Sequence, residues 1–165
     1  MRLVMAVSAD GYVARGLDDD MRWAGRADKQ AFRLLTSVGG VCAAGSTTFG
    51  LMPGLQGRRL VQLTRRAPQG FDQLDGARSM TLSQFAYAHP NGWLLGGQTV
   101  ALEALDGMML DEVFLVRNRT SLGSGVAEDM RWRMAKRFWD SRDVVTLDCE
   151  ADGSSAVVER WSRRG

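Results

Sequence analysis

One carboxyl group near the start of the chain stands where it could transfer a proton. Asp28 falls at helical spacing with Phe32 and Leu35, on a stripe where a core-facing helix carries apolar residues. A carboxyl held among apolar side chains has a raised pKa, and it can bind an amidine-like pair of donors and supply a proton. Trp23, in the loop before it, would then roof the same pocket. The alternative is a solvated carboxylate in the first helical turn, where the helix dipole favours Asp.

Two glycine turns could bind phosphate groups. Gly45-Ser46-Thr47-Thr48 and Gly96-Gly97-Gln98-Thr99 each lie between an expected strand and an expected helix. Free amides and the positive helix end attract anions there. In an open parallel sheet both turns would lie at the carboxyl ends of strands, the usual place of a nucleotide crevice. Neither turn matches a GxGxxG or GxxxxGK[ST] motif, so each alone could be an ordinary tight turn; the two together carry the prediction.

Basic residues bracket one expected strand. The pairs Arg58-Arg59 and Arg65-Arg66 are either solvated strand ends or recognition groups for a carboxylate and a phosphate. The only histidine, His89, lies beside a proline in an expected surface loop and has no convincing Cys or Ser partner. Triad and metal chemistry are therefore disfavoured, and no metal site is expected.

Strands and helices that could position these groups alternate along the chain. Strands are expected at residues 3–7, 41–44, 60–64, 79–81, 93–95 and 113–116. Helices are expected from Arg26 to the Gly39-Gly40 pair, after Gly45, and at 83–88 and 99–105. Residues 9–25 read as a functional loop, residues 126–138 as helix or irregular strand, and residues 144–161 as a closing hairpin that turns at Asp152-Gly153. This order predicts one α/β domain over residues 1–165, with a mostly parallel central sheet, flanking helices and a C-terminal antiparallel hairpin.

The composition suits a single globular domain. The chain has 165 residues, of which 45% are hydrophobic and 24% charged. Its formal net charge of +2 disfavours nucleic acid as a partner. Cys42 and Cys149 have no CxxC or ligand-like spacing, which predicts reduced thiols and a cytoplasmic location. No stretch approaches the roughly 20 apolar residues of a membrane span, and the apolar N-terminal run is too short for a signal peptide. We expect no membrane partner.

In their order and spacing, these motifs resemble dihydrofolate reductase over nearly the whole chain. The features that carry the resemblance are the opening strand that ends in Ala9-Asp10-Gly11, the Trp-x4-Asp-x3-Phe spacing from Trp23 to Phe32, Gly45-Ser46-Thr47-Thr48-Phe49, residues 55–58, residues 60–64, Leu95-Gly96-Gly97-Gln98 and the closing hairpin. The resemblance implies an NADPH-dependent oxidoreductase that converts 7,8-dihydrofolate to tetrahydrofolate. Hydride would go to C6, and Asp28 would assist the protonation of N5. It also implies NADPH as cofactor, dihydrofolate as the small-molecule substrate, and a monomer.

The same resemblance implies roles for individual residues. Met21 and Trp23 would belong to the mobile loop that closes over the nicotinamide, and would act in catalysis with Asp28. The substrate-binding residues would be Met5, Ala6, Asp28, Phe32, Leu55 and Arg58, with Phe32 on the pterin or benzoyl ring and Arg58 on the glutamate carboxylate. The cofactor-binding residues would be Ala6, Val13, Gly45, Ser46, Thr47, Thr48, Leu63, Thr64, Arg65, Gly96, Gly97, Gln98, Thr99 and Val100. Within that set, Gly96 and Gly97 would form a cis-peptide pair under the pyrophosphate.

Four positions depart from the family pattern. Ser46 stands where a basic residue is usual, which leaves any preference for NADPH over NADH to the Arg65-Arg66 pair. Ala101 replaces a tyrosine near the nicotinamide, and Arg22 replaces the loop proline. Val116 replaces the threonine that hydrogen-bonds the catalytic carboxylate. Each loss weakens catalysis more than it weakens the fold.

Two alternatives remain beside this function. The bacterial reductase domain of riboflavin synthesis shares the fold and is similar to residues 8–14, 111–113 and 122–125, but it generally lacks an acid at the position of Asp28. A pyrimidinone reductase is therefore the second enzyme hypothesis. The third hypothesis is a module that binds a pterin or nucleotide with little turnover, which Ala101 and Val116 favour.

Overall fold

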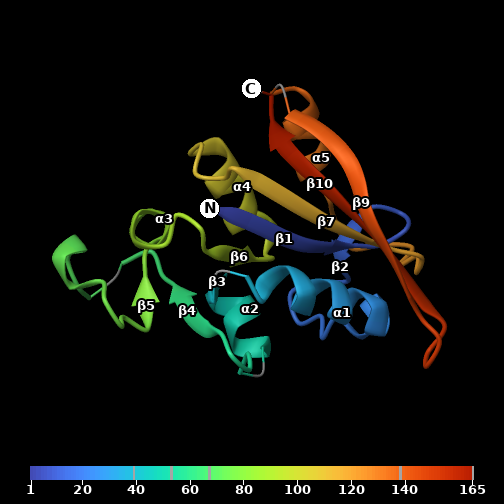
Figure 1. Ribbon diagram of the computed structural model, residues 1–165, viewed down its shortest axis with the longest axis horizontal. Coiled ribbons are helices and arrows are strands. Elements are labelled where there is room, and N and C mark those ends of the chain that lie inside the picture. The colour runs from blue at the N-terminus through green and yellow to red at the C-terminus, as the bar shows by residue number, and fades with distance from the viewer. Residues whose placement is uncertain (39, 53, 67, 138, 165) are drawn as a thin grey trace.

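An eight-stranded sheet runs through the molecule and carries its helices (Figure 1). The computed structural model describes residues 1–38, 40–52, 54–66, 68–137 and 139–164. The strand order is β5-β4-β3-β6-β1-β7-β10-β9. The strands are β1 (Arg2–Val7), β3 (Val41–Gly45), β4 (Arg59–Leu63), β5 (Ser79–Met80), β6 (Trp93–Leu95), β7 (Glu112–Asn118), β9 (Trp139–Cys149) and β10 (Ser154–Arg163). All neighbours from β5 to β7 are parallel, whereas β10 is antiparallel to both β7 and β9. The predicted mostly parallel sheet with an antiparallel C-terminal hairpin is confirmed.

Helices cover both faces of this sheet. They are α1 (Gly25–Thr36), α2 (Ser46–Leu51), α3 (Leu82–Ala88), α4 (Gln98–Asp106) and α5 (Met130–Ala135), with short 3-10 turns η1 (Arg22–Ala24) and η2 (Phe71–Gln73). On one face, Ala27 and Ala31 of α1 are fully buried against Val116 and Val158, since alanines let a helix lie close to a sheet. On the other face, α3, α4 and α5 pack on a second apolar cluster. None of the helices described is long and apolar enough to cross a membrane.

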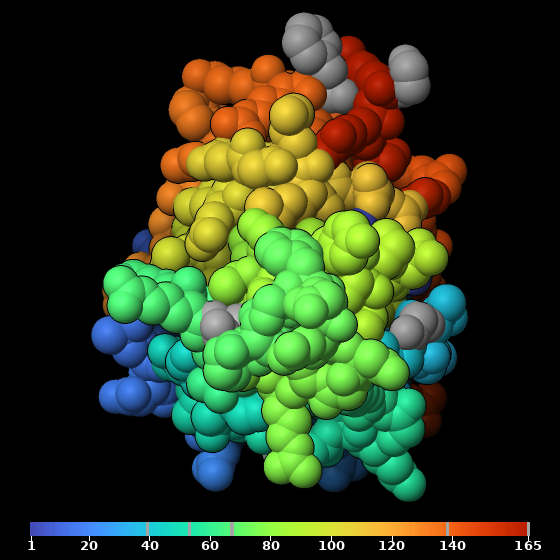
Figure 2. Space-filling model, turned by 90° about the vertical axis from the view of Figure 1, so that its left-hand side faces the viewer, coloured from blue at the N-terminus to red at the C-terminus, as the bar shows by residue number. Residues whose placement is uncertain are grey.

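The apolar run near the N-terminus forms the central strand β1. Leu3, Val4, Met5 and Val7 are all buried, because β1 lies between β6 and β7 with a helical layer on each side. The two ends of the sheet differ. At one end, green segments around β4, β5 and α3 form the front of the molecule (Figure 2). At the other end, β9 is an edge strand.

One expectation about secondary structure needs correction, and the structure decides one that was left open. Residues 9–25, expected as one loop, contain β2 (Tyr12–Ala14) and η1. Residues 126–138, left open between helix and strand, contain β8 (Val126–Ala127) followed by α5. β2 and β8 pair with each other as a separate two-stranded sheet. Elements this short carry no readable period, and only their pairing across the fold defines them. The expected helix stop at Gly39 lies outside the described residues, and α1 ends at Thr36.

Candidate active site

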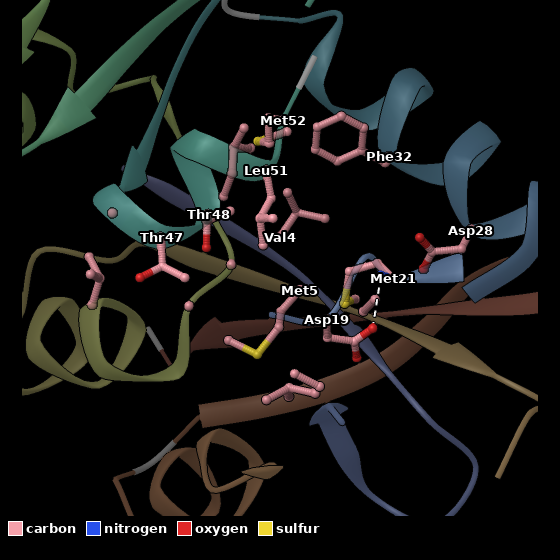
Figure 3. Close-up of a pocket in the computed structure, with 18 of the residues that line it drawn as sticks. Val4, Met5, Asp19, Met21, Asp28, Phe32, Thr47, Thr48, Leu51 and Met52 are labelled. Atoms are coloured by element: carbon pink, nitrogen blue, oxygen red, sulfur yellow. Dashed lines mark hydrogen bonds between the residues drawn. The ribbon is translucent and has the colours of Figure 1, made fainter. Parts of the chain in front are cut away.

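A cavity of about 1070 Å³ lies at the carboxyl ends of the parallel strands. Its floor includes the ends of β1, β3 and β6, and its walls come from α1, α2, the first turn of α4 and the loop before α1. Figure 3 shows Asp28 and Phe32 projecting from α1 on one side, with Thr47 and Thr48 of α2 on the other. This volume is at the upper end of the range for small-molecule sites, roughly 300–1,000 Å³. The cavity therefore has room for a large ligand, or for two ligands side by side.

Asp28 reaches the cavity because α1 turns a neighbouring stripe toward the sheet. Ala27 and Ala31 are fully buried in the core, whereas Asp28, Phe32 and Leu35 are only partly buried. The side of α1 that lies deepest against the sheet is therefore the one with Ala27 and Ala31, and Phe32 and Leu35 beside it still pack against the same core cluster. Residues four apart lie above one another on a helix, so Asp28 and Phe32 both line the cavity.

The carboxyl of Asp28 has a protein partner on β7. Asn118 Nδ2 donates to Asp28 Oδ1 over 3.0 Å. Burial raises the pKa of Asp28 to about 6, against the opposing effects of this hydrogen bond and the charge of Lys29. A carboxyl that titrates near pH 6 can hold or release a proton close to neutral pH, as a general acid or base must.

Sequence reasoning missed Asn118. Val116 occupies the place expected for a hydroxyl donor and lines the cavity with apolar atoms only. Asn118 lies two residues further along β7, and side chains two apart share a face of the sheet. The available signal was a polar residue at the end of an otherwise buried strand, but its partner is 90 residues away in sequence.

The two glycine turns come together as predicted. A Cβ atom on Gly97 would lie 3.6 Å from Thr48 Oγ1, and one on Gly45 would lie 3.1 Å from Val100 Cγ2. Backbone of the first turn therefore lies close to the start of α4. The predicted cis-peptide pair is wrong for this structure, since every peptide bond between described residues is trans. Gly96 and Gly97 make the turn instead with positive φ angles of 50° and 76°.

Most of the predicted site residues line this one cavity. They are Met5, Ala6, Val13, Met21, Asp28, Phe32, Gly45, Ser46, Thr47, Thr48, Leu55, Arg58, Gly96, Gly97, Gln98, Thr99 and Val100. Leu63, Thr64 and Arg65 do not line it, because they lie at and beyond the end of β4, on the far side of β3 from β1. Leu63 is adjacent to the site through its pairing with Gly45.

Trp23 does not roof the cavity. Its side chain is buried, and its indole Nε1 donates to Asp19 Oδ2 over 2.9 Å. Asp19 also accepts from the backbone N–H groups of Arg15, at 2.6 Å, and Met21, at 2.9 Å. Partial burial acts to raise the pKa of Asp19, but these hydrogen bonds outweigh it and lower that pKa. Asp19 and Met21 line the cavity in place of Trp23, so Asp19 organises this loop.

Replacing Asp19 by Asn should loosen the loop without unfolding the domain. An amide offers one acceptor oxygen where the carboxylate offers two, so at least one of the three donors would lose its partner. We expect faster amide hydrogen exchange and faster proteolysis over residues 15–23, measured by mass spectrometry. Asp18→Asn is the matched control, since Asp18 is exposed and accepts no hydrogen bond from the described residues. Equal protection in both variants would contradict the assigned role.

Arg58 is held at the Phe32 side of the cavity. One guanidinium nitrogen donates to the hydroxyl of Thr36, which is fully buried, and the guanidinium lies 5.5 Å from the centroid of the Phe32 ring. Among the described residues, no carboxylate forms an ion pair with Arg58. Arg58 is therefore a preoriented cation with donors left over for an anionic group.

The fold that carries this cavity resembles that of a solved structure. The chain is similar to the solved structure of dihydrofolate reductase from Enterococcus faecalis complexed with NADP(H) and RAB-propyl, with a TM-score of 0.72 and 19% sequence identity. The match covers 99% of this chain and 96% of that chain. The chain has the dihydrofolate reductase fold. No protein-family model matches the sequence, and no curated protein matches it at the sequence level.

Within the dihydrofolate reductase fold, the four sequence departures have different local settings. Ala101 is fully buried among the core residues of α4, and Val100 lines the cavity beside it. Arg22 is exposed and pairs with Asp20 at 2.9 Å. Ser46 accepts a long hydrogen bond of 3.3 Å from Gln62 Nε2. Of the four, only Val116 changes the immediate surroundings of Asp28, and Asn118 supplies a donor there.

Proposed function

We propose that this chain is a dihydrofolate reductase, which reduces 7,8-dihydrofolate to tetrahydrofolate with NADPH. The observation that carries the proposal is the carboxyl of Asp28, partly buried in the wall of the large cavity with its pKa raised to about 6. The 2-amino group and adjacent ring nitrogen of a pterin form a pair of donors, and a carboxylate accepts such a pair in bidentate geometry. When protonated, the same carboxyl can first give up the proton that N5 needs, and the carboxylate that remains then accepts the donor pair.

The residues at the glycine turns suit a dinucleotide. A side chain at Gly45 would crowd Val100, and the positive φ of Gly97 suits a residue without a side chain, so both turns keep their backbone open to a ligand. Amides at the start of α4, a helix of nine residues, are available to a pyrophosphate. When bound, NADPH supplies the hydride for C6. The solved neighbour of the same fold is complexed with NADP(H), which supports this cofactor class. Arg65 and Arg66, both exposed beyond β4, are our candidates for contact with the 2′-phosphate of NADPH.

The chain's own share of the reaction is positioning, exclusion of water and proton supply. Phe32, Met5 and Leu55 provide apolar contact for a pterin and a benzoyl ring, while Arg58 faces the carboxylate of the glutamate tail. Met21 and Asp19 cover the cavity from the loop. Asp28 holds the proton and passes it toward N5 through an ordered water.

Arg58→Leu should raise KM for dihydrofolate about 10- to 100-fold and leave KM for NADPH nearly unchanged. A charge-assisted hydrogen bond contributes roughly 1.5–3 kcal/mol, and a leucine keeps the apolar contact with Phe32. Steady-state kinetics with each substrate varied in turn measures both constants. The neighbouring Arg59→Leu is the control, because Arg59 contacts His89 and does not line the cavity. If the two variants have equal KM values for dihydrofolate, Arg58 does not recognise the tail.

A pyrimidinone reductase of the riboflavin type is the second candidate, and one observation favours it. The segments of residues 8–14 and 122–125, which resemble that family, contact each other through Asp10. Its carboxylate accepts from the backbone N–H of Gly123 at 2.7 Å and from that of Leu122 at 3.0 Å. Ser8 adds a hydrogen bond, and these bonds lower the pKa of Asp10 to about 2.

The decisive experiment follows NADPH absorbance with purified protein. We expect oxidation with dihydrofolate, and inhibition by methotrexate. Oxidation only with the ribosylamino-pyrimidinone substrate would replace our proposal with the second candidate. Thermal stabilisation by NADPH and methotrexate without oxidation of either substrate pair would identify a binding module.

A further inference from the structure

The amide of Asn118 is the only side-chain hydrogen-bond partner of the Asp28 carboxyl among the described residues. Asn118 is 5% exposed, at the end of β7 beneath α1. Its Nδ2 donates to Asp28 Oδ1 over 3.0 Å and to the backbone oxygen of Val116 over 3.1 Å. Both hydrogens of the amide nitrogen are therefore used.

The Val116 carbonyl determines which way this amide faces. Rotating the amide by 180° would turn Oδ1 toward two oxygens, that of Val116 and that of Asp28, and both bonds would be lost. The Asn118 Oδ1 atom itself is buried without a partner in the described part of the chain, so no competing donor favours the rotated state. Asn118 thus presents a fixed donor, and never an acceptor, to Asp28.

We propose that Asn118 is the positioning residue for Asp28, and that it determines which carboxyl oxygen carries the proton. This inference rests on the proposed reductase function. Because Oδ1 accepts the Asn118 hydrogen, a proton on Oδ1 would oppose the amide donor. The proton of the neutral acid is therefore carried on Oδ2, the oxygen without a protein partner. A single defined proton position is what a preorganised acid requires.

Other ionisable groups around Asp28 do not provide this contact. Lys29 follows it on α1 and is exposed, and its charge lowers the pKa of Asp28. Asp19 lines the same cavity from the loop, and Cys149 of β9 belongs to the core cluster under α1. Asp152, in the β9–β10 turn, accepts from the backbone N–H of Arg26. The β10 side chains in this cluster, Ala156 and Val158, are apolar.

Asn118 also separates two spaces. It lines a second hollow of about 570 Å³, together with Ser8, Arg117, Arg131 and Ser155. An alanine at this position would join the hollow to the Asp28 side and admit water. The informative replacements therefore keep the branching of the side chain at Cγ and remove the donor: Asn118→Leu, which is somewhat larger, and the isosteric Asn118→Asp.

The test is the pH dependence of kcat together with a titration of Asp28 that does not depend on turnover. In Asn118→Leu we expect the plateau of kcat to fall about tenfold and the descending limb to move about one unit to higher pH, because a donor to the ionised form is lost. Asn118→Asp should move the limb further in the same direction, since two carboxyls would then share one site. Adding Val116→Thr to Asn118→Leu should move the limb back by supplying a hydroxyl donor from the same face of β7.

The control is Ser155→Ala, since Ser155 is equally buried, lines the second hollow and has no partner for its hydroxyl in the part of the chain that the structure describes. The descending limb of the pH profile of Ser155→Ala should lie at the same pH as that of the wild type. Carboxyl carbon NMR of Asp28 in the free protein should show midpoints that move in the same direction in each variant, even if dihydrofolate is not turned over, so a failed reductase assay and a failed role for Asn118 are distinguishable. A lower plateau with an unmoved midpoint in both Asn118 variants would reduce Asn118 to a structural residue and overturn the proposal.

Discussion

Asp28→Asn should lower kcat with dihydrofolate by about 10²- to 10⁴-fold at neutral pH, the range typical for loss of a positioned acid. An amide keeps the shape of the carboxyl and still accepts from Asn118, so folding and NADPH binding should be retained. In the wild type, kcat/KM should fall as the pH rises above about 6, where Asp28 of the free protein loses its proton. The variant should lack this limb. Steady-state kinetics from pH 5 to pH 9 and NADPH binding by fluorescence measure both effects, and an unchanged rate would remove Asp28 from the mechanism.

The same substitution should stabilise the protein above pH 6. The pKa of Asp28 is raised on folding, from an ordinary 3.8 to about 6, so the ionised form destabilises the folded state. Well below its ordinary pKa of 3.8, the group is protonated in both states and contributes no difference. Between pH 4 and pH 6 the folded wild type binds more protons than the unfolded chain, so its stability falls as the pH rises. We expect a gain in unfolding free energy of about 1–3 kcal/mol for the variant at pH 7, shrinking toward zero near pH 4.

Urea denaturation of both proteins at pH 4, 5, 6 and 7 measures this difference. Asp18→Asn is the control for removing a negative charge at an exposed position nearby. A gain of equal size at every pH would mean that Asp28 has an ordinary pKa. Reduced kcat together with increased stability would identify Asp28 as a residue kept for function at the expense of stability.

Gly125→Ala should be among the most destabilising single substitutions in the chain. A Cβ atom there would lie 2.2 Å from the backbone oxygen of Ala14, and the φ angle of 152° is one that residues with side chains rarely adopt. The clash is between two backbone segments, so no side-chain movement relieves it. We expect a loss of about 3 kcal/mol or more, or separation of β2 from β8. Val13, Ala14 and Val126 line the cavity, so KM for NADPH should rise as well.

Gly123→Ala separates the two causes of this effect. Gly123 has a φ of 77°, but no atom lies within 4 Å of its would-be Cβ. Its alanine variant therefore has the conformational cost alone, about 1–2 kcal/mol. Thermal and urea unfolding of both variants measure the difference. Equal losses would show that the contact with Ala14 is relieved by a shift of the loop.

The sequence predicts well whatever depends on local pattern. The apolar run of β1, the strand-glycine-helix order at Gly45 and Gly96, and the helical spacing of Asp28 and Phe32 are all short-range features, and the fold contains each of them. Apolar spacing alone does not tell which of two adjacent stripes on α1 lies deepest against the sheet. Ala27 and Ala31 take that place because they are small.

Specific side-chain contacts and short strand pairs between distant segments could not be predicted from the sequence. Asn118 meets Asp28 across 90 residues, and neither neighbourhood in sequence contains a sign of the other. Trp23 was expected over the pocket because its spacing to Asp28 matches, yet the carboxylate of Asp19 binds its indole elsewhere. The pairing of β2 with β8 is equally remote. In each case, the position of a side chain or strand depends on a partner that becomes its neighbour only in the folded chain.

The position of β1 has a consequence for how the molecule forms. Leu3 pairs with Leu94 on one side and with Val113 on the other, so the middle of the sheet joins residues about a hundred positions apart. The entropy cost of closing such long loops comes before the favourable free energy of strand pairing. This order slows folding. During synthesis on the ribosome, β1 cannot pair until both of its neighbours, β6 and β7, have emerged. A ligand that binds above the carboxyl end of β1 can therefore stabilise the fold only after that point.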